Sequence, residues 1–300
     1  MAKRLRILIG ATLFALTITT TAFAQAAAPF SKQVEIYGQK IYYLEAGSSG
    51  PPVILLHGLG GDATNWAQTI PALASKYHVY APDQVGFGNS DKPIVNYRVA
   101  TLVEFLDQFY QKLGIEKAIL VGNSFGGWAA AAFAIAHPQK VDKLALVSAA
   151  GYSAKGYARG ETLKELYPAF NPSTTADMKR LFELLFYDKA LSTDAFVVPY
   201  FTKKLKTGDG YTINSFIDSF LRGEDFLDDK VKTIKAPTLL IWGREDKLTP
   251  PAMADAFAQD IQGSQKVIID QCGHVAQIEK AQIFNNALLK FLMGEAAAAR

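Results

Sequence analysis

The sequence predicts an α/β fold in which helices cover both faces of a mainly parallel sheet and a helical segment is inserted. Short apolar runs alternate with amphipathic segments, as where Val53–Leu56 is followed by a helical pattern over Thr64–Ser75. Several runs are apolar throughout, which is typical of strands buried on both faces. Between residues 151 and 234 the pattern is helical, with no convincing strand.

The first 24 residues have the pattern of a secretory signal peptide. Three basic residues within the first six positions precede an apolar run from Ile7 to about Thr20, and Ala22-Phe23-Ala24 is a small-x-small cleavage site. We therefore expect cleavage before Gln25, export to the periplasm or the medium, and no stable membrane insertion afterwards. A retained membrane anchor is the alternative, which the shortness of the apolar run disfavours.

Composition describes a globular chain with a sizeable core. Of 300 residues, 49% are hydrophobic and 20% are charged. The net charge of +3 falls to about zero without the signal peptide, so no nucleic-acid or anionic-surface partner is expected. Cys272 is the only cysteine, which excludes an intrachain disulfide, and we interpret it as a small buried core residue.

The remaining elements follow in order, and no internal repeat is present. Alternating residues on either side of Gly38 predict an antiparallel hairpin over Val34–Tyr37 and Lys40–Leu44. Further strands and helices then alternate, which favours parallel pairing. The expected strands are Tyr77–Ala81, Lys143–Ser148, Pro237–Trp242 and Lys266–Ile269, and the expected helices are Val99–Leu113, Pro251–Gln259 and Ala281–Met293.

A glycine-bounded serine is the focus of the chain. The apolar run Ala118–Val121 leads into Gly122-Asn123-Ser124-Phe125-Gly126, and an Ala-rich helical segment spans Trp128–Ala136. A G-x-S-x-G between a strand and a helix is the setting of a nucleophile elbow, in which a sharp turn lifts the serine hydroxyl above the sheet. Ser124 is therefore the candidate nucleophile.

A serine hydroxyl needs a base, and the base needs an acid to orient it. His274 lies in a loop just after the last expected strand, and Asp246 lies just after the preceding one, with Glu245 as its rival. Because carboxyl ends of parallel strands share one sheet edge, we expect Ser124, Asp246 and His274 to meet. His57 is expected to organise backbone instead of accepting protons.

Two backbone N–H groups are expected to stabilise the oxyanion formed during attack on a carbonyl. The elbow itself supplies that of Phe125. The second is expected from Leu59, in the loop after the first buried strand, with Gly60 as the alternative.

The helical segment 151–234 is expected to cover this site, because it leaves the sheet at a strand's carboxyl end and returns before the next strand. The chain accordingly divides into a core of residues 33–150 and 235–293 and a cap of residues 151–234. Phe182, Phe186, Phe216 and Phe220 give the cap an apolar, aromatic character that would suit an aliphatic or aromatic acyl group, although core packing is the simpler interpretation of these side chains.

Over residues 33–293 the chain resembles α/β-hydrolases of the lipase/esterase and C–C hydrolase branch. The motifs that carry the resemblance are His57-Gly58-Leu59-Gly60-Gly61, Asp83-x-x-Gly86-x-Gly88-x-Ser90, Gly122-x-Ser124-x-Gly126-Gly127, Asp246 and Gly273-His274. The related haloalkane dehalogenases and epoxide hydrolases attack through Asp at the elbow, which Ser124 disfavours. The export signal and the Gly58–Asp62 pattern resemble secreted or periplasmic bacterial lipases and esterases.

The leading interpretation is a serine carboxylesterase or lipase that cleaves a small-molecule ester through an acyl-enzyme on Ser124. Neither a metal site nor a nucleotide or other cofactor site is expected. A C–C bond hydrolase of ring-cleavage products is the nearest alternative, because Leu181–Leu191 and Gly273-His274-x-x-Gln277-x-Glu279 resemble that branch. Against it, the longer Gly-rich loop is missing, and Val275 stands where those enzymes usually carry Trp. A cofactor-free perhydrolase and a non-enzymatic small-molecule binder are further alternatives.

Overall fold

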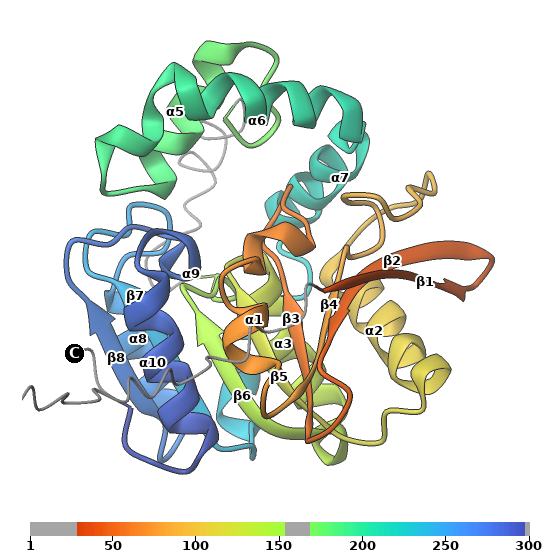
Figure 1. Cartoon of the computed structure of the whole chain (residues 1–300), viewed down its shortest axis with the longest axis vertical. Coiled ribbons are helices and arrows are strands. Elements are labelled where there is room, and N and C mark those ends of the chain that lie inside the picture. The colour runs from red at the N-terminus through yellow and green to blue at the C-terminus, as the bar shows by residue number, and fades with distance from the viewer. Residues whose placement is uncertain (1–28, 154–168, 298–300) are drawn as a thin grey trace, which may run out of the picture.

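A computed structural model describes residues 29–153 and 169–297 (Figure 1). The signal-peptide prediction falls outside the described residues. No helix within the described ranges is long and apolar enough to cross a membrane.

An eight-stranded sheet forms the centre of the molecule, with strand order β1-β2-β4-β3-β5-β6-β7-β8 (Figure 1). β1 pairs antiparallel with β2, and β2 pairs antiparallel with β4, whereas every later neighbour pair is parallel. This confirms the predicted mainly parallel sheet. The strands are β1 Phe30–Ile36, β2 Gln39–Ala46, β3 Pro52–Leu56, β4 His78–Pro82, β5 Ala118–Asn123, β6 Val141–Val147, β7 Thr238–Gly243 and β8 Gln265–Ile269.

Each face of the sheet has its own hydrophobic core. In β3, Ile54 and Leu56 join one cluster while Val53 and Leu55 join the other, as alternation along a strand requires. All four are at most 1% exposed, which explains their uninterrupted apolar run. Helices α2 Val99–Leu113, α3 Phe125–Ala136 and α8 Ala252–Asp260 supply the first cluster, and α1 Ile70–Leu73 and α10 Ala281–Leu292 supply the second.

The single helix predicted over Thr64–Ser75 is wrong. A 3₁₀ turn, η1, covers Ala63–Trp66, and the short helix α1 begins only at Ile70. Pro71 explains the restart, because proline has no N–H and is tolerated in the first turn of a helix but not in its interior.

Between β6 and β7 the described residues form helices and no strand, as the sequence predicts for residues 151–234. α5 and α6 lie at the top of the molecule in Figure 1, and α7 descends toward the sheet. Ile213 and Phe216 of α7 belong to the main core, whereas Met178 and Phe182 of α5 pack in a separate cluster with Val197 of α6. The cap elements are α5 Thr175–Leu185, η3 Lys189–Ser192, α6 Asp194–Thr207, α7 Gly210–Leu221 and η4 Asp228–Thr233.

Candidate active site

Ser124 lies on the tight turn between β5 and α3, in a backbone conformation that non-glycine residues rarely adopt (φ 56°, ψ −117°). The flanking glycines make this turn possible. A Cβ on Gly122 would lie 2.3 Å from the carbonyl oxygen of Gly126, and a Cβ on Gly126 would lie 2.4 Å from the carbonyl oxygens of Leu56 and His57. Strand, turn and helix therefore pack backbone against backbone, as expected for an elbow.

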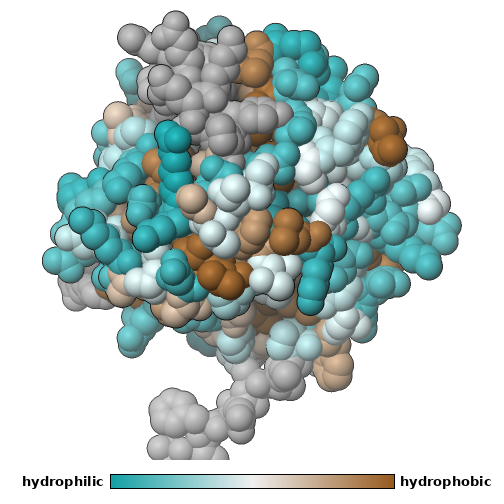
Figure 2. Space-filling view, turned by 90° about the horizontal axis from the view of Figure 1, so that it is seen from above, coloured by the Kyte–Doolittle hydropathy of each residue, from teal (hydrophilic) through white to brown (hydrophobic). Residues whose placement is uncertain are grey.

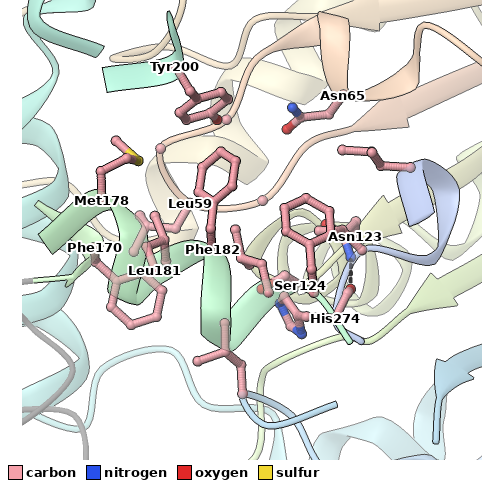
Figure 3. A pocket seen from close by; sticks show the side chains of 18 of the residues that line it. Leu59, Asn65, Asn123, Ser124, Phe170, Met178, Leu181, Phe182, Tyr200 and His274 are labelled. Atoms are coloured by element: carbon pink, nitrogen blue, oxygen red, sulfur yellow. Dashed lines mark hydrogen bonds between the residues drawn. The ribbon is translucent and has the colours of Figure 1, made fainter. Parts of the chain in front are cut away.

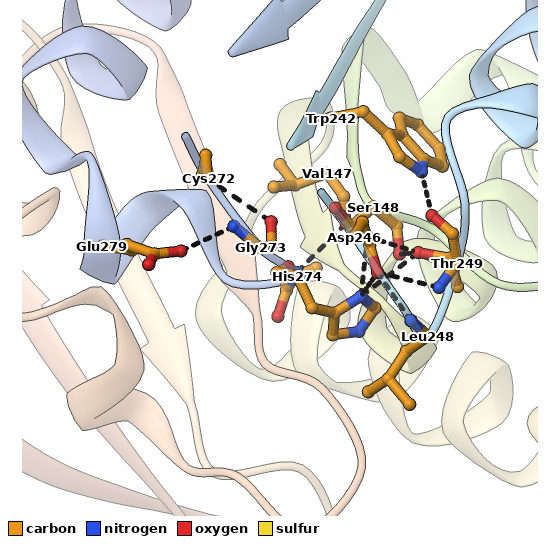
Figure 4. A network of polar contacts seen from close by, with 11 residues as sticks. Val147, Ser148, Trp242, Asp246, Leu248, Thr249, Cys272, Gly273, His274 and Glu279 are labelled. Atoms are coloured by element: carbon orange, nitrogen blue, oxygen red, sulfur yellow. Dashed lines mark hydrogen bonds and ion pairs between the residues drawn. The ribbon is translucent and has the colours of Figure 1, made fainter. Parts of the chain in front are cut away.

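The structure brings His274 and Asp246 together at the ends of β8 and β7 (Figure 4). His274 Nδ1 lies 3.0 and 2.9 Å from the two carboxylate oxygens of Asp246, and both side chains are buried. Backbone N–H groups of Leu248 and Thr249 each donate to Asp246 Oδ1 at 2.9 Å. Burial alone would raise the pKa of Asp246, but the imidazole and these hydrogen bonds lower it below its usual value.

Thr249 is a contact that the sequence interpretation missed. Its Oγ1 lies 2.8 Å from Asp246 Oδ2, 3.0 Å from the carbonyl oxygen of Ser148 and 3.2 Å from His274 Nδ1. The hydroxyl can therefore donate to either oxygen while its lone pairs face the imidazole N–H. The only sequence signal is the Asp-x-x-Thr spacing, in which a short polar side chain caps nearby backbone.

Two glutamates hold the histidine loop. Glu245, the alternative candidate for the acid, accepts the N–H of Cys272 at 2.9 Å and so binds backbone in the structure. Glu279, in the short helix α9 Ala276–Glu279, accepts the N–H groups of Gly273 at 2.6 Å and of Asp188 in the cap at 2.7 Å. The backbone N–H of His274 donates to the carbonyl oxygen of Leu185 at 2.7 Å. The loop is thus joined to both core and cap.

The loop after β3 passes directly beside Ser124. A Cβ on Gly58 would lie 3.3 Å from Ser124 Cβ, and Leu59 and Gly60 line the same cavity as Ser124. Phe125 is the first residue of α3, so its N–H belongs to the helix turn that has no intrahelical acceptor. These positions suit the oxyanion donors, whose role remains a prediction.

The imidazole of His57 organises this loop by hydrogen bonding to backbone groups. The buried imidazole Nδ1 lies 2.8 Å from the carbonyl oxygen of Gly58, and the N–H of Gln84 donates to Nε2 at 3.0 Å. Gln84 Nε2 also donates to the carbonyl oxygen of His57 at 2.8 Å. Burial lowers the pKa of His57, which favours the neutral ring that can accept at Nε2 and donate at Nδ1.

A cavity between core and cap contains both Ser124 and His274 (Figure 3). Tyr200 and Asn65 lie on one side of it, and Phe170 and Leu181 lie on another. Most of the cap residues that line it are apolar. They are Phe170, Met178, Leu181, Phe182, Leu185 and Phe186, joined by Leu248, Val275 and Ile278 of the core and by Tyr200 and Lys204 of α6.

Only half of the predicted aromatic cap residues face this cavity. Phe182 and Phe186 line it, whereas Phe216 and Phe220 pack against Phe125 at ring-centroid distances of 4.6 and 5.6 Å. Core packing therefore accounts for the α7 pair. Among the described residues, no group of three or more His, Cys, Asp or Glu side chains is placed to hold a metal ion.

The arrangement of hydroxyl, imidazole, carboxylate and backbone N–H groups suits nucleophilic attack on a carbonyl carbon. The family described as alpha/beta hydrolase fold matches residues 51–281 of the chain. The chain belongs to the alpha/beta hydrolases. It is accordingly a hydrolase, and the interpretation as a non-enzymatic binder on this fold is not retained.

Relatives of this hydrolase include enzymes that are named as hydrolases of hydroxy-oxo-dienoates and of meta-cleavage products. It is 33% identical over 264 residues to the 2-hydroxy-6-oxononadienedioate/2-hydroxy-6-oxononatrienedioate hydrolase of Cupriavidus pinatubonensis, covering 84% of this chain and 90% of that one. A meta-cleavage product hydrolase from Pseudomonas fluorescens IP01 is similar in structure, with a TM-score of 0.77 and 33% identity over 88% of this chain and 97% of that one. A membrane phospholipase A matches with a TM-score of 0.80 and 30% identity, over 89% and 86% of the two chains.

These comparisons overturn the carboxylesterase interpretation, because several curated relatives carry the names of hydrolases of hydroxy-oxo-dienoates and of 2-hydroxymuconate semialdehyde, which matches the C–C hydrolase alternative. The error has a physical cause. A serine triad with an oxyanion hole can attack an ester and a ketone carbonyl alike, so the catalytic motifs do not separate the two reactions. Val275 and the short Gly58–Gly61 loop, which counted against the C–C branch, do not outweigh 33% identity over 264 residues.

Proposed function

We propose that this alpha/beta hydrolase cleaves the C–C bond next to the ketone of a 2-hydroxy-6-oxo-dienoate, the type of compound that ring cleavage produces. The observation that carries the proposal is the similarity to hydrolases with names of this kind over 84–85% of the chain. The cavity supports it, because an apolar wall lies beside polar groups and would suit a substrate with a hydrocarbon acyl end and a polar dienoate end.

The leaving carbon must be able to hold the bonding electron pair. In the 2-hydroxy-dienoate, transfer of the proton from the 2-hydroxyl to C5 gives a ketone at C2 that is conjugated with a C3–C4 double bond. When the C5–C6 bond breaks, the electron pair passes through that double bond to the C2 oxygen. The departing fragment is then a stabilised dienolate, which is far easier to release than a simple carbanion.

We assign the nucleophilic step to Ser124. Its Oγ attacks C6 while His274 accepts the hydroxyl proton, and Asp246 holds the imidazole in place and stabilises its positive charge. The N–H groups of Leu59 and Phe125 stabilise the oxyanion on C6. The C5–C6 bond then breaks, and the proton on His274 passes to the dienolate oxygen to give 2-hydroxypenta-2,4-dienoate.

Water completes the reaction. His274 removes a proton from a water molecule as it attacks the acyl carbon on Ser124, and the ester bond to Oγ breaks with return of the proton to the serine. The overall change is addition of one water to one substrate, giving a carboxylic acid and the hydroxydienoate. No oxidant or reductant enters this balance.

The test is turnover of 2-hydroxy-6-oxo-6-phenylhexa-2,4-dienoate by the purified protein, followed by loss of the dienolate absorbance and by mass spectrometry of benzoate and 2-hydroxypenta-2,4-dienoate. We expect stoichiometric products, and a loss of at least about 10³-fold in kcat for Ser124→Ala. Turnover no faster than that of Ser124→Ala would contradict the proposal, as would a much higher kcat/KM for p-nitrophenyl or phospholipid esters.

We further propose that the chain is exported, as its first 24 residues suggest. The support is the basic start, the apolar run and the Ala22-Phe23-Ala24 site. Mass spectrometry of the protein from fractionated cells should then find an N-terminus at Gln25 in the periplasm or medium. An uncleaved chain in the cytosol would contradict this.

A further inference from the structure

Lys204 is the only lysine or arginine among the described residues that line the cavity. It belongs to α6 of the cap, and its side chain is only 9% exposed. Burying an ammonium group is costly, so its placement against a cavity calls for an explanation. Lys203 and Lys206 on the same helix are exposed, as surface lysines normally are.

Asp209 forms an ion pair with this lysine. The Nζ of Lys204 lies 2.6 and 2.7 Å from the two carboxylate oxygens of Asp209, whose side chain is 1% exposed. Burial lowers the pKa of Lys204, and the attraction of Asp209 opposes that shift. The two contacts use at most two of the three ammonium N–H donors. Asp209 is not among the cavity-lining residues, whereas Lys204 is.

The ammonium group also lies beside the expected oxyanion loop. A Cβ on Gly60 would be 3.0 Å from Lys204 Nζ, and Gly60 follows Leu59, whose N–H is the expected oxyanion donor. A substrate whose reacting carbonyl is held at Leu59 and Phe125 would thus have part of its chain close to this cation. Tyr200, one helical turn earlier on α6, and Asn65 contribute further polar groups to the cavity.

We propose that Lys204, held by Asp209, binds the carboxylate of the substrate and so selects anionic dienoates over neutral ketones. This rests on the proposed function, which it deepens by assigning the polar end of the cavity. The acyl end of the substrate then lies against the apolar wall that includes Leu181 and Phe182. The competing explanation is that the Lys204–Asp209 pair only fixes the end of α6 against the start of α7.

The test compares two substrates that differ only in charge, 2-hydroxy-6-oxo-6-phenylhexa-2,4-dienoate and its methyl ester at C1. For Lys204→Met we expect KM for the acid to rise on the order of 10- to 100-fold, as for loss of a hydrogen bond to a charged group, with kcat little changed. KM for the methyl ester should stay within about 3-fold, and Lys204→Arg should restore most of the preference for the acid.

Lys206→Met is the matched control, because it removes the same charge from an exposed position on the same helix and should change neither KM. Thermal unfolding of each variant checks that the cap remains folded. Equal losses on acid and methyl ester in Lys204→Met would overturn the proposal in favour of the structural role. An equal effect of Lys206→Met would also overturn it.

Failure of the proposed function can be told apart from failure of this inference. If the wild type cleaves neither substrate, calorimetric binding of the dienoate to Ser124→Ala and to Ser124→Ala/Lys204→Met decides. If the double variant binds the acid more weakly than Ser124→Ala does, but binds the methyl ester equally well, the result would still support a carboxylate site. Binding that is absent or equal in both variants would overturn it.

Discussion

The serine turn and the cap wall of the cavity are built in opposite ways. At the turn, backbone packs on backbone, and residues 125–131 are all buried. In the cap, α5 and α6 share a small cluster of their own, and Phe196 and Leu205 of α6 are 51% and 65% exposed. Seen from the cap side, the surface is mainly hydrophilic with scattered apolar patches (Figure 2). The contrast suggests that the core sets the chemistry and that the cap sets the substrate.

The largest expected effect comes from Gly126→Val. Its side chain would meet the carbonyl oxygens of Leu56, the last residue of β3, and of His57, which follows it, so β3 or α3 would have to move. We expect loss of soluble, folded protein. Gly208→Ala is the cap control, because φ is +68° but nothing lies within 4 Å of the added Cβ, and it should cost about 1–2 kcal/mol. Equal melting temperatures for the two variants would contradict the expected difference in packing between the serine turn and the cap.

Asp246→Asn should lower kcat by roughly 10²- to 10⁴-fold while leaving the fold intact. The asparagine oxygen can still accept from Leu248 and Thr249, but the amide cannot stabilise a charged imidazole. Glu245→Gln is the control, since Glu245 contacts backbone, and it should cost less than about 10-fold. Steady-state kinetics on the dienoate provides the measurement. A greater loss of kcat in Glu245→Gln than in Asp246→Asn would show that Glu245, and not Asp246, is the acid that orients His274.

Changes at Leu181 should alter selectivity more than rate. Leu181 lines the cavity from α5, so Leu181→Ala enlarges the space for the acyl group and Leu181→Phe reduces it. We expect the kcat/KM ratio between 6-phenyl and 6-methyl dienoates to rise in the first variant and fall in the second, by roughly 10-fold each. Ratios that stay constant would show that this wall does not contact the acyl group.

The smallest effect concerns acid stability. The pKa of Asp246 is lower in the folded protein than in the unfolded chain, so its contribution to stability is present above the ordinary carboxyl pKa of about 3.9 and is lost as pH falls through the folded value. Asp246→Asn should therefore lose less stability than the wild type between pH 6 and pH 3. Denaturant unfolding at each pH measures this, and parallel curves would contradict it.

The features that sequence predicts well are those with local causes. The glycines around Ser124 reveal the elbow because backbone contact leaves no space for a Cβ, and the apolar strand runs fix which loops share the sheet edge with Asp246 and His274. Thr249 and Glu279 act through contacts between distant segments. Lys204 lies in a lysine-rich stretch typical of a solvated helix face, so nothing local distinguishes it from Lys203 and Lys206.

The sequence motifs do not distinguish ester cleavage from C–C cleavage, for a related reason. Ser124, Asp246 and His274 define how a carbonyl is attacked, whereas the bond that breaks depends on which leaving group the cavity accepts. That property belongs to cap side chains such as Leu181, Phe182 and Lys204, whose positions follow from tertiary packing. Local pattern therefore predicts the chemistry of a site more readily than its substrate.

The hydrogen bonds between the histidine loop and the cap have a consequence for the catalytic cycle. The backbone N–H of His274 donates to Leu185, and Glu279 accepts from both Gly273 and Asp188, so the end of α5 and the backbone of the histidine loop share anchors. If the cap moved away at this edge, the histidine loop would lose its backbone hydrogen bonds to the cap as the cavity opened, while Asp246 still held the imidazole. Substrate or water that enters at that edge would then meet a fully anchored base only after the cap has closed again.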